Sequence, residues 1–255
     1  MRSRRLHAWL VIVCLLGVAC SEPANDSPAI VERDDWGEAF ADAGVEGTFV
    51  LREVGSTTTE VWNLERATSA RLPASTFKIL NSLIILDADV VADVDEVAPW
   101  DGVDRGLPVW NQDHSLRSGI EVSAVWLYQR HARAVGAEQM AAGVAAAAYG
   151  NTDIGGDIDR FWLDGDLRIT AIEQVDFLER LVLGDLPFAE ADIEAVLDIL
   201  VRERTDGSVW RHKTGTALAT TPELGWLVGT TEHDGRRFVF AMNLDLEPVE
   251  AVAAE

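Results

Sequence analysis

Cysteine is scarce in this chain, with two among 255 residues. Cys14 lies inside an apolar N-terminal segment, so Cys20 is the one cysteine expected in the mature protein, and an intrachain disulfide is excluded. Basic residues are also few, with 21 Lys and Arg against 43 Asp and Glu and a formal charge of −22. This balance disfavours nucleic acid and anionic membrane surfaces as partners. No protein partner is evident from the sequence.

The apolar run at the N-terminus is short. Residues 8–19 follow three arginines and are too few to span a bilayer as a helix. This arrangement predicts a signal peptide over residues 1–19, whose removal takes the formal charge from −22 to −25. Leu16-Gly17-Val18-Ala19-Cys20 resembles a bacterial lipobox, although Gly17 stands where Leu is usual. We therefore expect an exported, periplasmic protein that is lipid-anchored at Cys20 or simply secreted, with residues 20–33 as a flexible tether.

Two kinds of site have no support in the pattern. The five histidines show no paired metal-ligand spacing, and the aspartates do not form a calcium loop, so no metal site is expected. The chain also lacks a G-x-S-x-G elbow, which argues against a Ser-His-Asp hydrolase.

Hydrophobic periodicity predicts an α/β protein of the α+β type. Strand patterns occur near both ends of the chain and helical patterns between them, while residues 93–119 are rich in loops. One antiparallel sheet built from both termini, with an inserted helical region, is the expected architecture, and residues 34–255 are expected to form one domain. The expected strands are 47–51, 60–64, 209–213, 224–230 and 237–243, and the expected helices are 73–86, 120–135, 137–148, 170–183 and 193–201.

Three short strings carry the chemistry. In Ser75-Thr76-Phe77-Lys78, the three-residue spacing places a hydroxyl and an amine on one face of a helix. Pro73 opens that helix, so Ser75 is expected in its first turn, where backbone N–H groups favour negative charge. Lys78 precedes an apolar run, and burial would push its amine towards the neutral form. Ser123-Ala124-Val125 and Lys213-Thr214-Gly215-Thr216 then add a second hydroxyl and a second amine.

With these strings in this order, the chain resembles the class D serine β-lactamases, the oxacillinase group, over residues 49–246. The resemblance implies the β-lactamase/transpeptidase-like fold and hydrolysis of β-lactam antibiotics. Class A enzymes would instead show S-D-N at the second string. The matching strings are P-A-S-T-F-K (73–78), N-S-L-I (81–84), W-D-G (100–102), W-N-x-D-H (110–114), S-A-V (123–125), Y-G-N (149–151), F-W-L-D-G-D-L-R-I (161–169) and K-T-G-T (213–216).

The resemblance implies roles for individual residues. Ser75 would be the nucleophile that forms the acyl-enzyme. Lys78 would be carboxylated on its amine by CO₂ to N6-carboxylysine and act as the general base, held by the indole N–H of Trp162. Ser123 would pass a proton to the lactam nitrogen, and Val125 would cover the carbamate with apolar surface. No other cofactor is implied.

The third string is implied to bind the substrate. Lys213 would face the substrate carboxylate, on a strand that continues through Thr214, Gly215 and Thr216. The backbone N–H groups of Ser75 and Thr216 would form the oxyanion hole.

Two other functions remain open. A penicillin sensor of this family stays acylated, but such receptors carry several transmembrane helices and a polar residue where this chain has Val125. A penicillin-binding protein acting on peptidoglycan shares some motifs, but F-W-L-D-G and S-A-V argue against it.

One feature departs from the family. A C-terminal helix, preceded by an Arg that binds the substrate carboxylate, would follow the last strand. This chain stops at Glu255 and no Arg follows Arg237. Either the sequence is truncated or the protein lacks that helix, and the residue that replaces this Arg is left open.

Overall fold

The computed structural model describes residues 28–205 and 207–246. Within these ranges the chain forms seven strands and several helices, with short 3-10 turns at residues 34–36, 74–77 and 108–110. In chain order the strands and α-helices are β1 (Ala29–Glu32), α1 (Gly37–Ala43), β2 (Gly47–Glu53), β3 (Thr58–Trp62), α2 (Leu64–Ala67), α3 (Lys78–Asp87), α4 (Leu116–Glu121), α5 (Val125–Val135), α6 (Ala137–Ala146), α7 (Ala171–Leu183), α8 (Glu190–Ile199), β4 (Val201–Thr205), β5 (Ser208–Ala217), β6 (Glu223–His233) and β7 (Arg236–Leu246).

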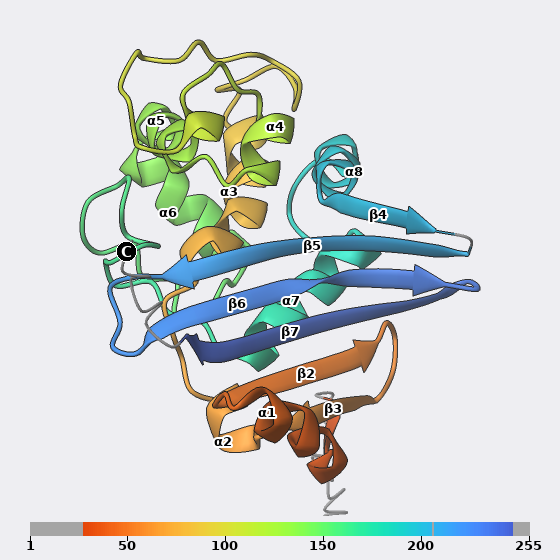
Figure 1. The fold of residues 1–255 in the computed structure, drawn as a ribbon. Coiled ribbons are helices and arrows are strands. Elements are labelled where there is room, and N and C mark those ends of the chain that lie inside the picture. The colour runs from red at the N-terminus through yellow and green to blue at the C-terminus, as the bar shows by residue number, and fades with distance from the viewer. Residues whose placement is uncertain (1–27, 206, 247–255) are drawn as a thin grey trace, which may run out of the picture.

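The sheet joins the two ends of the chain. Its strand order is β1-β3-β2-β7-β6-β5-β4, so the N-terminal hairpin pairs directly with the last strand (Figure 1). All neighbouring strands are antiparallel except β1 and β3, which are parallel. The predicted fold, an antiparallel sheet built from both termini and flanked by helices, is confirmed.

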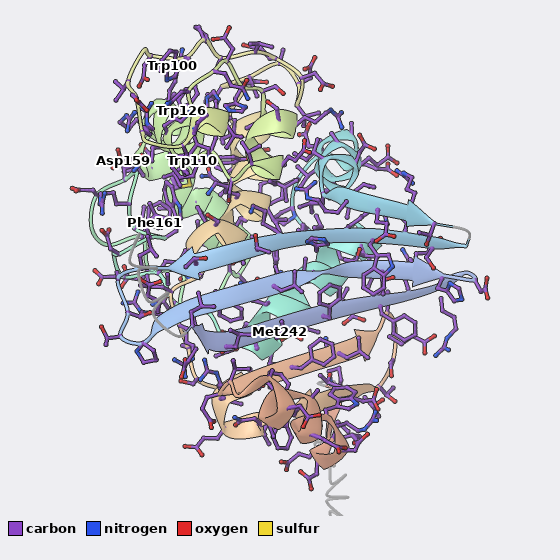
Figure 2. All side chains as sticks on the ribbon, in the orientation of Figure 1. Trp100, Trp110, Trp126, Asp159, Phe161 and Met242 are labelled. Atoms are coloured by element: carbon purple, nitrogen blue, oxygen red, sulfur yellow. The ribbon has the colours of Figure 1, made fainter. Side chains whose placement is uncertain are left out.

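The two faces of the sheet differ. α7 lies behind the sheet and packs on β2 and β7, while α3 to α6 gather above one end of β5 (Figure 1). On the opposite face, β2, β7, β6 and β5 carry an apolar groove of about 530 Å³ that includes Met242 (Figure 2). No helix of the described residues lies in front of β5, β6 and β7 on that side.

Helix α3 is the centre of the helical region. Its residues 78–86 are all buried, because the segment is apolar on nearly every side after Lys78 and is surrounded by α5, α6 and α8. The capping box predicted at Thr170 is present: its hydroxyl accepts from Glu173 N, and the Glu173 carboxylate accepts from Thr170 N. α7 then ends at Gly184 in the left-handed conformation, as expected.

The helix expected over residues 120–135 is wrong as a single element. The structure divides it into α4 and α5, with Ser123 between them at φ 58°. α4 begins earlier, because Ser115 caps it: Ser118 N donates to Ser115 Oγ, and Ser115 N donates to Ser118 Oγ in return. The break matters for function because it presents Ser123 at a bend instead of along a helix face.

Several short elements were not expected from the sequence. β1, α1, α2 and β4 are additional, and β1 lies inside the segment expected as a tether. The helix expected over 193–201 ends at Ile199, and Val201 already belongs to β4.

Some expectations fall outside the described residues. The signal peptide, the lipobox with Cys20 and the C-terminal end from residue 247 onward are among them. Among the helices that are described, none has the length and apolar character needed to cross a bilayer.

Candidate active site

A cleft of about 590 Å³ opens where five segments meet. They are the 3-10 turns over residues 74–77 and 108–110, the bend before α5, the end of β5, and the loop that leads to α7. Six of the nine residues expected to form the site line this cleft, whereas Lys78, Trp162 and Lys213 lie behind its surface. The lining side chains and backbone belong to Ser75, Trp110, Ser123, Val125, Arg160, Leu163, Asp164, Thr214, Gly215, Thr216, Leu218 and Ala219.

Ser75 and Lys78 lie together as their spacing predicts. Lys78 Nζ donates a hydrogen bond to Ser75 Oγ at 2.7 Å. Ser75 lies in the 3-10 turn Ala74–Phe77, immediately before α3 instead of within its first turn. Lys78 is 0% exposed, and burial, reinforced by the positive charge of Lys213, lowers the pKa of its amine well below the usual 10.5. A neutral amine at this position can accept a proton or react as a nucleophile.

Trp162 lies under the same turn. Ala74 N donates to Trp162 O at 3.0 Å, and the indole stacks on Phe77 with 5.5 Å between ring centroids. Phe161 packs edge-on against both rings, and Figure 2 shows it beside the end of β5. The indole Nε1 is buried and has no acceptor within the described residues. Leaving such a donor unpaired costs about 1–3 kcal/mol, so this atom points to a missing acceptor.

Ser123 supplies a second buried hydroxyl. Its Oγ also has no partner among the described residues. The left-handed backbone of Ser123 and that of Ala74, at φ 48°, are both unusual for residues with a side chain. Backbone of this kind concentrates at functional sites, and here it flanks the cleft on two sides.

Hydrogen bonds from Trp110 and Trp126 hold the cleft wall near Ser123 in place. Trp126 Nε1 donates to Trp110 O at 2.8 Å, and Trp110 Nε1 donates to Val122 O at 2.9 Å. Figure 2 shows both indoles in the helical region above the sheet. These bonds fix the loop before the bend that carries Ser123, next to Val125.

Strand β5 forms the remaining wall. Lys213 is 3% exposed, and its Nζ donates to Thr214 O at 2.9 Å. Burial, with the nearby charge of Arg202, lowers the pKa of Lys213 to about 8. Thr214 and Thr216 are exposed to the cleft.

Gly215 allows β5 to approach the nucleophile. A Cβ at this position would lie 3.1 Å from Pro73 O and 3.2 Å from Ser75 N. Both neighbours are backbone atoms, so a larger residue would push the strand away from the turn. The backbone of β5 therefore runs directly beside Ser75 N, where an oxyanion hole requires it.

The outer wall of the cleft was not expected from the sequence. Arg160, Leu163 and Asp164 face the cleft from the turn over residues 157–164, and Arg160 forms an ion pair with Asp164. Leu218 stands opposite and is 72% exposed. Leu163 and Asp164 follow Arg160 at i+3 and i+4, a spacing that could have indicated one shared face. The charges of Arg160 and Asp164 suggested a solvated surface instead.

One of the histidines has its hydrogen bonds inside the fold. His114 is buried, with its two ring nitrogens bonded to Ser118 Oγ and Val109 O at 2.9 Å each. Across residues 28–205 and 207–246, no three His, Cys, Asp or Glu side chains gather as metal ligands would.

Comparison with known proteins gives the family. Residues 41–254 match the penicillin binding protein transpeptidase domain. The chain is 38% identical to the β-lactamase OXA-5 of Pseudomonas aeruginosa over 247 residues, covering 96% of this chain and 90% of that protein. It is likewise 38% identical to the β-lactamase OXA-48 of Klebsiella pneumoniae over 250 residues, covering 96% and 91%.

Solved structures agree. A class D β-lactamase from Nostoc aligns with a TM-score of 0.82 at 40% identity, covering 86% of this chain and 92% of that one. FUS-1, a class D β-lactamase from Fusobacterium nucleatum subsp. polymorphum, aligns with a TM-score of 0.83 at 39% identity, covering 86% and 91%. The chain belongs to the class D β-lactamase family.

Proposed function

We propose that this protein is a serine β-lactamase, an enzyme of antibiotic resistance that hydrolyses penicillin-type lactams through an acyl-enzyme on Ser75. The observation that carries the proposal is the 2.7 Å contact between Ser75 Oγ and a fully buried Lys78 amine. A hydroxyl beside a buried base is the arrangement that activates a serine nucleophile.

In the acylation step, Ser75 Oγ forms a bond to the lactam carbonyl carbon. The negative charge that develops on the carbonyl oxygen would be stabilised by the backbone N–H groups of Ser75 and Thr216. The carbon–nitrogen bond of the ring then breaks, and Ser123 Oγ passes a proton to the leaving nitrogen. The proton that Ser75 loses is accepted by the base at Lys78, whose Nζ lies 2.7 Å from Ser75 Oγ.

The residues around Lys78 fit a carboxylated amine. A neutral amine combines with CO₂ and releases one proton, whereas an ammonium cannot react. Burial favours the neutral amine, and Trp162 Nε1, which has no acceptor among the described residues, would supply a donor for a carboxylate. Carboxylation of Lys78 would provide a general base beside Ser75. Val125, at the cleft wall, would shield this site from bulk water.

Substrate binding would rest on β5. Lys213 provides positive charge near the substrate carboxylate, and Thr214 and Thr216 offer hydroxyl groups on the cleft surface. Gly215 keeps the strand close enough for one substrate to reach both the strand and Ser75.

A penicillin-sensing domain is the alternative. Such a protein would also be acylated on Ser75 but would not turn over, and the apolar Val125 favours turnover. Stopped-flow kinetics with mass spectrometry on benzylpenicillin separates the two functions. Rapid release of penicilloic acid supports the hydrolase, and a long-lived adduct on Ser75 identifies a sensor.

The Ser75→Ala variant tests the nucleophile. We expect kcat for benzylpenicillin to fall by about 10⁴-fold or more, with no acyl adduct by mass spectrometry. Thermal unfolding should show that the variant is folded. Hydrolysis at the wild-type rate in the folded variant would contradict the proposal.

For the whole chain we propose a signal peptide over 1–19, a tether over 20–33 and one catalytic domain over 34–255. The protein would be exported to the periplasm and anchored through a lipid on Cys20. Intact-mass analysis of protein taken from its native membrane should reveal a diacylglyceryl adduct. An unmodified Cys20 in a soluble product would instead indicate plain secretion.

A further inference from the structure

Tyr128 is a buried aromatic ring beside Lys78 to which the proposed function gives no role. It lies in α5 and is 0% exposed. Lys78 Nζ lies over this ring, 5.4 Å from its centroid. This distance is within the range of an interaction between a cation and a π face.

The position of the ring is fixed by the helix that carries the lysine. Tyr128 Oη and Ser82 Oγ are 2.9 Å apart, and Ser82 Oγ donates to Lys78 O at 2.8 Å. The ring is thus tied to the first turns of α3 through a single side chain. Burial also raises the pKa of the Tyr128 phenol well above its usual 10, so the ring stays neutral at physiological pH.

A neutral ring acts on the protonation state of Lys78. The face of an aromatic ring carries partial negative charge, which favours an ammonium over a neutral amine. Burial and the charge of Lys213 act in the opposite direction. The Ser75 hydroxyl bonded to Lys78 Nζ carries no charge. The charge of Arg202 lowers the pKa of Lys213 and of the Tyr128 phenol, and Lys213 is the one charged group that shifts the pKa of Lys78 among the described residues.

We propose that the face of the Tyr128 ring sets the pH at which Lys78 becomes carboxylated. This inference rests on the carboxylation described under the proposed function. Carboxylation consumes the neutral amine, forms a nitrogen–carbon bond to CO₂ and releases a proton. Because the ring favours the ammonium, it opposes this reaction and moves the midpoint for carboxylation to higher pH. Tyr128 is therefore a positioning residue that shifts the pH range in which the base forms.

The test is a pH titration of the carbamate by carbon-13 NMR at fixed dissolved CO₂, using labelled bicarbonate and the folded full chain. Tyr128→Phe keeps the ring and removes the hydroxyl, whereas Tyr128→Leu removes the ring. We expect the midpoint of Tyr128→Phe to stay close to wild type and that of Tyr128→Leu to fall by about one pH unit. Tyr128→Met serves as a second ring-free variant if the leucine variant fails to fold.

The outcomes separate the two proposals. An unchanged midpoint in the folded ring-free variants would overturn the inference, as would an equal shift in the phenylalanine variant, which would assign the effect to the hydroxyl. Absence of any carbamate signal in the wild-type protein would overturn carboxylation itself, and the inference with it. The experiment measures the carbamate signal and not the activity. A loss of activity caused by looser packing would therefore not be mistaken for the expected shift of the midpoint.

Discussion

The floor and the outer wall of the cleft are built in opposite ways. The floor consists of Lys78 and Trp162, which lie just behind the cleft surface and are both 0% exposed. Buried aromatic side chains pack against the Lys78 amine and the Trp162 indole. The outer wall presents Arg160 and Asp164, whose side chains are 49% and 35% exposed and pair mainly with each other. One turn of chain, residues 157–164, supplies Trp162 to the floor and the ion pair to the wall.

This difference separates chemistry from selection. In the floor, low dielectric surroundings strengthen each electrostatic interaction, and close packing leaves each atom a single position. At the wall, water and salt screen the ion pair, so a change there costs little stability. Substitutions in the floor should therefore affect every substrate, and substitutions in the wall should affect substrates according to their side chains.

After the nucleophile itself, the largest effect is expected at Lys78. Lys78→Ala removes the proposed base beside Ser75, and we expect kcat to fall by about 10³-fold for every lactam tested. Burst kinetics should show that acylation itself is slowed. A variant that still acylates at the wild-type rate would place the base elsewhere.

The next largest effect is expected for Trp162→Phe. Phenylalanine keeps a ring against Phe77 but removes the N–H that has no acceptor in the described part of the chain, so the loss should be about 10-fold to 100-fold in kcat. Deacylation should suffer more than acylation, and added bicarbonate at neutral pH should restore part of the loss. Leu163→Ala, on the wall side of the same turn, is the matched control and should show no bicarbonate dependence.

Lys213 should make kcat/KM fall at alkaline pH. Its pKa of about 8 means that the positive charge proposed to face the substrate carboxylate is lost above that value. We expect kcat/KM to fall about tenfold per pH unit above pH 8, and Lys213→Arg should abolish this limb because arginine stays charged.

The same pKa has a consequence for stability. Between about pH 8 and 10.5 the unfolded chain binds more protons at this lysine than the folded chain does. The contribution of Lys213 to the free energy of unfolding therefore becomes more favourable as the pH rises through that window. Denaturant unfolding of wild type and Lys213→Met across these pH values would show whether the slope becomes smaller in the variant, the remainder being due to the buried Lys78 amine.

The smallest effect is expected at the wall. Arg160→Ala should change kcat/KM for benzylpenicillin by no more than about threefold, because the exposed pair contributes little by itself. Lactams that carry a charge on the acyl side chain should respond more strongly, and Asp164→Asn should change them in the opposite direction. Equal effects on all lactams would show that the wall positions the floor instead of selecting substrates.

The floor could be predicted from the sequence because its spacing is local. The gap of three residues between Ser75 and Lys78 places the pair on one helix face whatever surrounds it. The position of Ser123 could not be predicted in the same way. The apolar residues that follow it continue a helical pattern, and the break depends on caps and on a left-handed residue that periodicity does not reveal.

The edges of the sheet and the wall were missed for a related reason. β4 has the sequence V-R-E-R-T, whose charged residues suit an exposed edge strand but resemble a loop when read alone. Arg160 and Asp164 likewise resemble ordinary surface charges until the turn brings them to the cleft. Both features depend on which distant segments they contact in the fold, and the residues next to them in the sequence do not show this.

The pairing of β2 with β7 has a consequence for how the protein is made. Val50 pairs with Ala241, so neighbouring strands of the sheet come from almost opposite ends of the chain. During synthesis β2 has no partner on that side until β7 has emerged, and contacts this distant in sequence close slowly. One edge of the N-terminal hairpin therefore has no partner until the whole helical region and β7 have been made. Charged residues on that edge, such as Arg52 and Glu53, disfavour pairing with other strands during that interval.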